Sequence, residues 1–480
     1  VDAWGKVTLE QRGNNLEITS AYTASAGRLI SRCMGHGNCD VQADTYDWDP
    51  LGNLLWRERR VAPSTGNNNN LYNPNYRKYR ETFAYDSLNR VISGELGLYT
   101  TIASTQSALA ASSLTMAYDA LGNICQRSVN GSTLYMRYLG SASCGGSAAP
   151  QADGGSSTFN SPHALTWAAT GPGGNQPRTA YAYDAHGNQI SAVRVDSTTL
   201  PNNRHVRYTA EQQAWHMAQG NELTRIFYGP DGARYKRIDQ GLNATTQTLY
   251  LGNVELVLKN STPSIRRYLA GVAMMEIEPV LNTRTVKRLL HDHLGSVSVV
   301  LSNADRTVWE RYDYDAFGQR RAALGDPRTV WNGTPTHTNR GFTGHEMLDA
   351  FGIVHMNGRI YDSRTARFLQ ADPFVQEPNN PQNFNRFTYL WNNPLNATDP
   401  SGYLGVKERQ WVATAVAIVG AVVFQQYQLL GTLGTWGTAG YFAAVGAISG
   451  GIATQSWSGA AWGAFSGAVS AGWSIGFDKA

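Results

Sequence analysis

A short motif recurs six times along this chain, and this repeat constrains the fold more than any other feature. Each copy places Tyr-Asp, or a near variant, before a short spacer and Gly-Asn or a relative of it. The copies occupy residues 46–53, 85–90, 118–123, 183–188, 228–233 and 314–319. Repetition at intervals of tens of residues is typical of an array of equivalent supersecondary units. We therefore expect a repeat array.

Each copy has the composition of a β-hairpin turn. The Asp side chain can accept hydrogen bonds from backbone N–H groups two or three residues later, the Gly can adopt a positive φ, and Asn tolerates the left-handed region at the exit. Alternating residues such as Thr115 and Ala117 before one copy, and Ile124 and Gln126 after it, indicate flanking strands. The tyrosine is expected on the last strand residue, where its ring packs across strands. We therefore predict a structural role for these aspartates, and antiparallel strands with very short or no helices over residues 1–340.

Composition agrees with many turns and aromatic sheet faces. The chain has 49 Gly, 24 Tyr and 13 Trp, and only 16% of its residues are charged. Its 40 basic and 36 acidic residues give a net charge of +4, which provides no electrostatic argument for a nucleic-acid partner. No cofactor is indicated either.

The four cysteines are too few for a disulfide scaffold. Cys33 and Cys39 flank a single histidine but lack the Cys-x-x-Cys spacing of zinc sites, so no metal site is expected. A local disulfide between these two residues and a pair of free thiols both remain open. Cys125 and Cys144 are a second possible pair.

The repeat resembles the YD repeats of the RHS family, and motifs near the C-terminus strengthen this resemblance. They are similar to the RHS-repeat-associated core, which ends the repeat array in bacterial polymorphic toxins and in the C subunits of insecticidal toxin complexes. In order, the motifs are His291-Asp292-His293-Leu294-Gly295-Ser296-Val297, Tyr312-Asp313-Tyr314-Asp315-Ala316-Phe317-Gly318, Arg340-Gly341-Phe342-Thr343-Gly344-His345-Glu346, Asn357-Gly358-Arg359-Ile360-Tyr361-Asp362, Ala366-Arg367-Phe368-Leu369-Gln370-Ala371-Asp372-Pro373 and Asn392-Asn393-Pro394-Leu395-Asn396-Ala397-Thr398-Asp399-Pro400-Ser401-Gly402-Tyr403. The resemblance covers residues 1–404, and we expect the chain to be a C-terminal fragment of such a protein.

The resemblance implies a mainly β fold in which antiparallel hairpins wind into a spiral shell, or β-cage. Residues 1–340 would form the YD-repeat shell. Residues 341–404 would form the RHS-repeat-associated core, with an aspartyl autoprotease plug. Residues 405–480 would be an uncharged Gly/Ala-rich extension, either the start of an effector or a membrane-active segment.

Two Asp-Pro dipeptides carry the candidate chemistry. Two carboxylates that lie close together in a poorly solvated site cannot both ionise, so one keeps its proton as an acid while the other activates water. The resemblance implies self-cleavage just after the second Asp-Pro, with Asp372 and Asp399 as the catalytic pair. Arg367 would be the cation that holds or tunes a carboxylate. The cleaved bond is predicted between Tyr403 and Leu404. The alternative is that both dipeptides are turns, which Asp before Pro favours.

The tail after Leu404 differs sharply in composition from the rest of the chain. Residues 410–477 contain no Asp, Glu, Lys or Arg. Small residues at GxxxG-like spacing, such as Gly459, Gly463 and Gly467, would let two helices approach closely. Two interpretations of residues 405–480 remain open. They form either a membrane-active helical hairpin that contacts a membrane, or an apolar segment packed inside the shell or within a toxin core.

Two functional classes compete. In the first, the repeats form a secreted or cell-surface bacterial shell that encloses a C-terminal toxin or effector and cuts it free, as in interbacterial competition. Its partners would be the enclosed effector, a secretion-system or toxin-complex partner and an immunity protein. In the second, the array is a cell-surface adhesion or carbohydrate-binding protein without proteolysis. The recurrence of aromatic residues at hairpin positions favours a packing role for them, and the Asp-Pro core and the uncharged tail favour the shell.

Overall fold

The computed structural model describes residues 1–2, 5–37, 39–61, 76–102, 105–138, 159, 161–171, 178–195, 203–321, 337–375 and 377–403. The chain divides into two units, Val1–Leu404 and Gly405–Ala480. The second unit lies outside the described residues, and with it the predicted membrane-active or packed tail. Leu404 and Cys144 also lie outside them.

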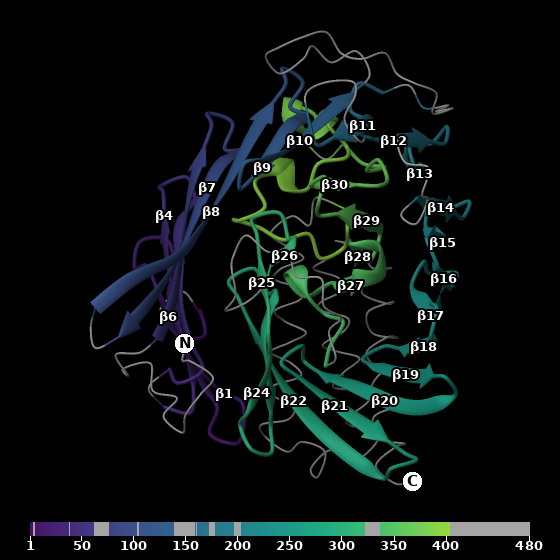
Figure 1. The fold of residues 1–480 in the computed structure, drawn as a ribbon. Coiled ribbons are helices and arrows are strands. Elements are labelled where there is room, and N and C mark those ends of the chain that lie inside the picture. Colours follow the sequence, from purple (N-terminus) through teal and green to yellow (C-terminus); the bar gives the residue numbers. More distant parts are fainter. Residues whose placement is uncertain are drawn as a thin grey trace, which may run out of the picture. The chain divides into compact units, whose positions relative to one another are not determined.

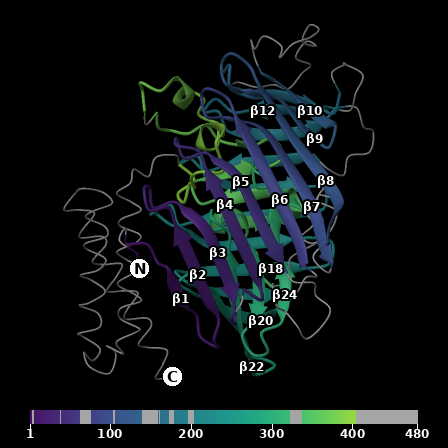
Figure 2. The same ribbon diagram turned by 90° about the vertical axis from the view of Figure 1, so that its left-hand side faces the viewer.

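One 24-stranded antiparallel sheet dominates the first unit, and each strand pairs with its neighbours in sequence (Figures 1 and 2). The mainly β fold with consecutive hairpins is therefore confirmed. The strands of this sheet are β1 (Leu9–Gln11), β2 (Glu17–Tyr22), β3 (Leu29–Gly35), β4 (Gln42–Trp48), β5 (Leu54–Val61), β6 (Tyr76–Tyr85), β7 (Val91–Ile102), β8 (Thr105–Tyr118), β9 (Ile124–Val129), β10 (Ser132–Tyr138), β11 (Leu165–Ala169), β12 (Arg178–Tyr183), β13 (Gln189–Arg194), β14 (Arg204–Tyr208), β15 (Ala214–Gln219), β16 (Glu222–Tyr228), β17 (Arg234–Gln240), β18 (Thr245–Leu251), β19 (Val254–Lys259), β20 (Thr262–Leu269), β21 (Ala273–Glu278), β22 (Thr283–His291), β23 (Val297–Ser302) and β24 (Val308–Arg311).

Smaller elements follow the large sheet along the chain. They are β25 (Asp313–Tyr314), β26 (Arg320–Arg321), β27 (Glu346–Leu348), β28 (Ile353–Met356), β29 (Arg359–Asp362), β30 (Arg367–Phe368) and the 3-10 turns η1 (Phe342–Gly344), η2 (Asp349–Phe351), η3 (Pro381–Phe384) and η4 (Leu390–Asn392). Strands β27 to β30 form a four-stranded antiparallel sheet. We call residues 337–403 the inner segment.

The repeat motif makes the hairpin turns, and its aspartate is structural as predicted. In the copy at 118–123, Asp119 Oδ1 accepts hydrogen bonds from the backbone N–H of Leu121 and of Asn123, both at 2.9 Å. Gly122 adopts a φ of 80°, which an L side chain rarely adopts. Asn123 serves differently from the prediction, because its amide Nδ2 donates to Asp119 Oδ2 at 2.9 Å. The Gly therefore takes the left-handed conformation, and the Asn holds the Asp.

The first copy is shifted by two residues from its predicted position. Trp48, rather than Tyr46, is the last residue of β4, and Asp49 Oδ1 accepts the backbone N–H of Asn53 at 2.8 Å. The spacing from Asp49 to Gly52 equals that from Asp119 to Gly122, which explains why the turn forms there. The prediction that Tyr46-Asp47 begins this turn was wrong.

The aromatic residue before each turn links successive hairpins through its polar atom. Tyr118 Oη, for example, donates to the backbone carbonyl of Val91 at 2.6 Å, the first residue of β7. Burial raises the pKa of the Tyr118 hydroxyl, so it remains a donor. Similar bonds join Trp48 to Leu29, Tyr85 to Leu54, Tyr208 to Gln189, Tyr228 to Ala214 and Tyr314 to Val297. Tyr138, the last residue of β10, donates in the same way to the carbonyl of Ile124. The repeated tyrosine is therefore both a packing group and a donor.

Removing one of these hydroxyls is expected to destabilise the shell measurably. Tyr118→Phe leaves the carbonyl of Val91, a residue that is fully buried, without this donor. An unsatisfied buried polar group lowers the free energy of unfolding by about 1–3 kcal/mol. Chemical denaturation followed by tryptophan fluorescence measures this loss. The control is Tyr235→Phe, because Tyr235 is 50% exposed and should change little. Equal stabilities of the two variants would contradict the proposed linking role.

The large sheet curves around the inner segment, as Figure 1 shows for the strands around β27 to β30. Three hydrophobic clusters join the two layers at different arcs of the sheet. One cluster packs Met217 and Ile226, from β15 and β16, against Ile353 and Ile360, from β28 and β29. The second cluster joins Leu54, Phe83, Val91, Leu114, Ile124, Met136 and Tyr183 of the sheet to Phe387 and Leu395, and the third joins Leu289, Val297 and Val300 to Phe342, Met347, Val354, Tyr361 and Tyr389. Phe317 also belongs to the second cluster, and Tyr312 and Tyr314 belong to the third.

Side chains connect the two ends of the large sheet, and among the described strands β1 and β24 do not pair with each other. Arg12 Nη1 donates to the carbonyl of Leu289 at 2.7 Å, and Asn14 Nδ2 donates to that of Asn303 at 2.6 Å. A hydrophobic cluster formed by Leu16, Ile18, Met34, Val41, Leu290, Val299 and Leu301 lies at the same place. The described strands thus wind into a spiral, as predicted.

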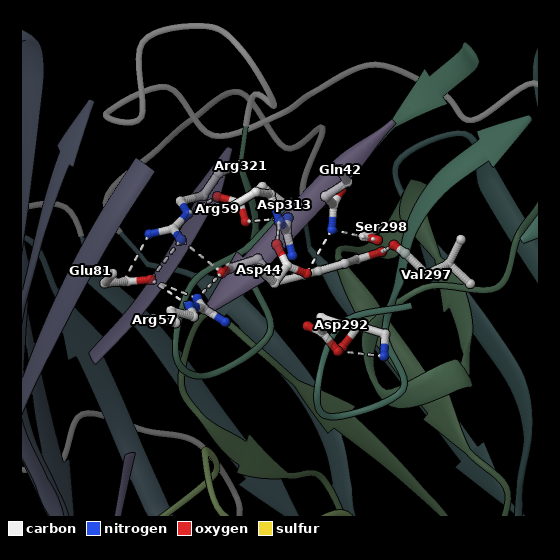
Figure 3. Close-up of polar contacts among 12 residues, drawn as sticks. Gln42, Asp44, Arg57, Arg59, Glu81, Asp292, Val297, Ser298, Asp313 and Arg321 are labelled. Atoms are coloured by element: carbon white, nitrogen blue, oxygen red, sulfur yellow. Dashed lines mark hydrogen bonds and ion pairs between the residues drawn. The ribbon is translucent and has the colours of Figure 1, made fainter. Parts of the chain in front are cut away.

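A buried ion-pair network ties β25 and β26 to the first strands of the sheet (Figure 3). Glu81, on β6, accepts Arg57 Nη2 at 2.7 Å and Arg321 Nη2 at 3.0 Å. Arg321 Nε also pairs with Asp313 at 2.9 Å, and both arginines donate to the carbonyl of Tyr314. Residues about 240 positions apart in the chain are thereby held together. We call these residues the Glu81 network.

The cysteine prediction is settled for one pair. Cys33 and Cys39 form a disulfide, with Cα atoms 4.9 Å apart. The second pair stays a prediction, because Cys144 is outside the described residues. Within the described ranges, no cluster of three or more His, Cys, Asp and Glu suits a metal ion, and no helix is long and apolar enough to cross a membrane.

Candidate active site

The tight turn between β28 and β29 places Arg359 at the centre of the site. Asn357 adopts a φ of 63° in this turn, and Gly358 follows it directly. Arg359 is therefore the first residue of β29, and its side chain is 2% exposed. Its guanidinium carbon lies 3.6 Å from the centre of the Phe368 ring, which supports the planar group from one side.

One nitrogen of Arg359 faces both predicted catalytic carboxylates. Arg359 Nη2 lies 2.9 Å from Asp372 Oδ2 and 3.6 Å from Asp399 Oδ2. Asp372 is 4% exposed and Asp399 is 2% exposed. The structure thus brings together two aspartates that are 27 positions apart in the sequence.

Hydrogen bonds with Arg386 hold the backbone of Asp372 in place. Its N–H donates to the carbonyl of Arg386 at 2.8 Å, and Arg386 Nη1 donates to the carbonyl of Asp372 at 3.1 Å. Arg359 Nη1 donates to that same Arg386 carbonyl at 3.1 Å. The Arg386 carbonyl therefore fixes the backbone of Asp372 and the side chain of Arg359 relative to each other.

Residues 399–403 lie directly on the β28–β29 turn. The N–H of Gly358 donates to the carbonyl of Ser401 at 2.8 Å, and Asn357 Nδ2 donates to that of Pro400 at 2.8 Å. Gly402 has a φ of 76°, and a Cβ there would overlap the carbonyl oxygen of Met356. Arg359 Nε donates to the Gly402 carbonyl. The Gly of the Asp-Pro-Ser-Gly sequence is thus required by this close approach.

Tyr403 ends the described chain inside the site. Its hydroxyl donates to the carbonyl of Gly358 at 3.2 Å, and its ring packs edge-on against Phe374 with centroids 6.1 Å apart. A Cβ at Gly358 would overlap the Tyr403 ring. The predicted residue before the cut is therefore seated in a defined place.

His345 holds the backbone of Asp399. Burial, together with the nearby cations Arg340 and Arg234, lowers the pKa of His345 to about 4, although the hydrogen bond to the Asp399 backbone opposes this shift, so the imidazole is neutral near pH 7. His345 Nε2 lies 2.9 Å from the carbonyl oxygen of Asp399, and a carbonyl can only accept, so Nε2 carries the proton. Sequence reasoning did not single out this residue.

The surroundings of Asp399 make its carboxyl easier to protonate than that of an exposed aspartate. Burial raises the pKa of this carboxyl, and the nearby charge of Asp372 raises it further, although Arg359 and the Ser401 hydroxyl oppose the rise. Burial also lowers the pKa of Arg359, although a guanidinium remains charged. Asp372, at 2.9 Å from that cation, is the better placed of the two to carry a negative charge. A neutral acid beside a charged carboxylate is the arrangement that acid–base chemistry requires.

Arg359, rather than Arg367, is the cation beside these carboxylates. Arg367 Nη2 instead donates to the carbonyl of His163 at 2.5 Å and to Asn385 Oδ1 at 3.2 Å, and its guanidinium lies over the Tyr138 ring. Arg367 therefore joins the inner segment to the shell. The two arginines differ in position, because Arg359 begins β29 at the turn that residues 401 and 402 contact, whereas Arg367 lies on β30. Arg359 belongs to the motif at residues 357–362, but no sequence feature of that motif indicates a contact with Asp372 or Asp399.

The turn interpretation describes part of the same geometry. Asp372 Oδ1 accepts the N–H of Phe374 at 2.9 Å, and the carbonyl of Asp399 accepts the N–H of Gly402 at 3.4 Å. These bonds use one carboxylate oxygen of Asp372 and the backbone of Asp399. The remaining Oδ2 atoms face Arg359, so turn formation does not account for them.

Comparison with known proteins identifies the fold. No family model matches the chain. The curated tRNA(Glu)-specific nuclease WapA of Bacillus subtilis subsp. natto (strain BEST195) is 27% identical over 158 residues, which cover 33% of this chain and 6% of WapA. Two crystal structures, of TcdB2-TccC3-TEV and of TcdB2-TccC3 without the hypervariable C-terminal region, each match with a TM-score of 0.60 and 18% identity, over 83% of this chain and 19% of theirs.

A third match is the Photorhabdus luminescens Tc holotoxin pore, in a form with an Asp→Ala mutation in TccC3. Its TM-score is 0.59 at 18% identity, and the match covers 84% of this chain and 18% of that one. This chain thus spans about a fifth of the length of these structures. The described part of the chain has the fold of the RHS/YD-repeat shells of the Tc toxins, and the resemblance predicted from its motifs is confirmed for the fold.

Proposed function

We propose that this chain is an RHS-type shell that encloses a C-terminal effector segment and releases it by cutting its own backbone between Tyr403 and Leu404. The observation that supports this most is the placement of Asp372 and Asp399 at one buried arginine nitrogen, next to a seated Tyr403. Two carboxyls in a desolvated site are suited to peptide hydrolysis at neutral pH.

In the proposed reaction, a water molecule attacks the carbonyl carbon of Tyr403. Asp372, as the charged carboxylate, takes a proton from this water, and the neutral Asp399 supplies a proton to the reacting amide. The C–N bond to Leu404 then breaks as Asp372 gives its proton to the amide nitrogen and a hydroxyl proton of the intermediate returns to Asp399. Arg359 stabilises the negative charge on Asp372 throughout, and His345 holds the Asp399 backbone in place.

The adhesion alternative receives less support from the buried tyrosines. The repeated aromatic residues that would serve as stacking platforms for sugars use their polar atoms to bind backbone carbonyls of the preceding hairpin. Tyr46, Tyr138 and Tyr183 are each at most 5% exposed. These rings are therefore committed to packing between repeats.

The proposed partners are an enclosed effector that begins near Leu404 and a toxin-complex protein comparable to the TcdB2 present in the similar structures. Secretion, an immunity protein, and a membrane contact through residues 405–480 remain predictions. A denaturing gel of freshly expressed chain tests the function directly, because self-cleavage yields two fragments and its absence leaves one band.

Arg359 variants should separate the role of this cation from that of Arg367. Arg359→Ala removes the only positive charge that pairs with both carboxylates in the described site, so we expect cleavage to slow by about 10²-fold or more. Arg359→Lys keeps the charge but not the planar fork, and should be intermediate. Arg367→Ala should slow cleavage less, because its contacts lie elsewhere. A time course on denaturing gels measures all three rates, and a larger effect of Arg367→Ala would contradict this assignment.

The pH dependence of the reaction follows from Asp399. Since burial raises the pKa of this carboxyl, it retains its proton to a higher pH than an exposed aspartate would. The cleavage rate should therefore fall as the pH rises through this pKa. Rates measured from pH 4 to 9 check this prediction, and a rate that rises steadily over that range would contradict it.

A further inference from the structure

Ser401 places its hydroxyl on the peptide group that is proposed to be cut. Ser401 Oγ donates to the carbonyl oxygen of Tyr403 at 2.9 Å. The same oxygen accepts the backbone N–H of Tyr403 at 3.1 Å and lies 3.3 Å from Asp399 Oδ1. The Tyr403 carbonyl belongs to the bond between Tyr403 and Leu404. One small side chain thus connects the candidate acid to the reacting carbonyl.

A count of hydrogens determines the direction of these bonds. A serine hydroxyl has one proton to donate and two lone pairs with which to accept. When Asp399 is ionised, its carboxylate and the Tyr403 carbonyl compete for the single Ser401 proton. When Asp399 is protonated, it can donate to Ser401 Oγ, and the Ser401 proton is then directed at the Tyr403 carbonyl. The protonated form of Asp399 therefore completes a continuous chain of donors.

We propose that Ser401 is a third catalytic residue of the self-cleavage, which binds the carbonyl oxygen of Tyr403 and transfers to it a proton from Asp399. This inference rests on the proposed function and adds a route for the acid's proton. The cut chain thus contributes part of its own catalytic apparatus, three residues before the bond that breaks.

Both steps of the proposed hydrolysis conserve atoms and protons. Water adds to the Tyr403 carbonyl carbon and gives one proton to Asp372, while Ser401 gives its proton to the carbonyl oxygen and receives one from Asp399. In the second step the tetrahedral intermediate expels the Leu404 nitrogen, which takes the proton held by Asp372. The hydroxyl proton of the intermediate returns through Ser401 to Asp399. The products are a carboxyl group on Tyr403 and an amino group on Leu404, with both aspartates restored.

Ser401 Oγ helps to hold the turn by accepting the Tyr403 N–H, but three other bonds hold the same turn without it. The bonds from Gly358 N–H to the Ser401 carbonyl, from Asn357 Nδ2 to the Pro400 carbonyl and from the Tyr403 hydroxyl to the Gly358 carbonyl do not involve the Ser401 side chain. The hydroxyl can therefore be removed while these contacts remain. Its bond to the Tyr403 carbonyl is the one that matters for chemistry.

The test compares three variants of the full-length chain. Ser401→Ala removes the hydroxyl, Ser401→Thr keeps one, and Asn357→Ala removes a bond that holds the same turn but leaves the hydroxyl in place. The chains are synthesised in a cell-free system with a short pulse of labelled amino acid, and uncut and cut bands are followed on denaturing gels. We expect Ser401→Ala to cut about 10²-fold more slowly than the parent, since loss of one donor to a reacting carbonyl has an effect of that order. Ser401→Thr should stay within about tenfold of the parent, and Asn357→Ala should slow less than Ser401→Ala.

The pH dependence of the cleavage rate distinguishes a catalytic from a structural role of Ser401. Loss of a merely structural contact would leave that pH dependence unchanged. The parent rate should fall as Asp399 ionises, whereas the residual rate of Ser401→Ala should depend much less on that ionisation because the transfer route is gone. A Ser401→Ala chain that cuts as fast as the parent, or that slows no more than Asn357→Ala with an unchanged pH profile, would overturn the proposal. If the parent is not cut, or Asp372→Asn cuts at the parent rate, the proposed function itself fails. If the parent requires both aspartates but not Ser401, only this inference fails.

Discussion

Chains with Asp372→Asn or Asp399→Asn are each expected to stay uncut under conditions in which the parent releases the segment that begins at Leu404. Asparagine keeps the size of the side chain but can neither take a proton from water nor supply one as a carboxylic acid. Loss of a general acid or base slows a reaction by about 10²–10⁴-fold. Time courses on denaturing gels, with equal amounts of chain, measure this effect.

A matched control separates chemistry from folding. Asp305 also accepts a backbone N–H in a turn, from Thr307 at 3.1 Å. Its side chain is exposed, and the residue is far in sequence from Asp372 and Asp399. Asp305→Asn should therefore cut like the parent. Far-UV circular dichroism of all three variants should show the same strand signal. If both active-site variants are cut at the parent rate, Asp372 and Asp399 are turn residues and the proteolytic assignment is wrong.

Glu81→Gln is expected to cause the largest loss of stability among single substitutions in the shell. Glu81 is 3% exposed and pairs with Arg57 and Arg321. Neutralising it removes the carboxylate that both buried guanidinium groups share, and leaves Asp313 as the acidic partner of Arg321 in the network of Figure 3. Breaking a buried ion pair at one partner lowers the free energy of unfolding by roughly 3–5 kcal/mol. Chemical denaturation measures the change.

The pH dependence of this loss has a definite sign. Burial alone would raise the pKa of Glu81, but Arg321 and Arg57 outweigh burial, so the pKa of the folded state lies below the usual value. The contribution of Glu81 to stability is therefore complete above the pKa of the unfolded state and is lost as the pH falls through that of the folded state. The stability difference between the parent and Glu81→Gln should narrow in acid.

An ion pair with a more exposed carboxylate provides the control for Glu81. Glu10 pairs with Arg12, but its side chain is 37% exposed. Solvent screens such a pair, so Glu10→Gln should lower the free energy of unfolding by less than about 1 kcal/mol. Equal losses for Glu10→Gln and Glu81→Gln would show that the Glu81 network does not hold β25 and β26 to the first strands.

Local chemistry made the hairpins predictable from the sequence. An Asp, a Gly with positive φ and an Asn lie within five residues of one another, and they interact mainly with each other, as Asp119, Gly122 and Asn123 do. The first turn shows where motif matching fails. Tyr46-Asp47 has the residue types of the motif, but Trp48-Asp49 occupies the corresponding position in the structure.

The site was only partly predictable, because its partners come from separate turns. Asp372 and Asp399 could be named from the family resemblance, since each sits in a recognisable Asp-Pro motif. Arg359 and His345 could not, because their roles depend on how residues 399–403 fold back onto the β28–β29 turn. That contact is tertiary, and strand alternation alone does not reveal it.

Intact-mass spectrometry of freshly purified parent chain tests the central claim most directly. The proposed self-cleavage predicts two masses, which correspond to residues 1–403 and 404–480, and a single full-length mass for Asp399→Asn prepared in parallel. A parent chain that shows only the full-length mass, or fragments that end at a residue other than Tyr403 and also form in Asp399→Asn, would contradict the account.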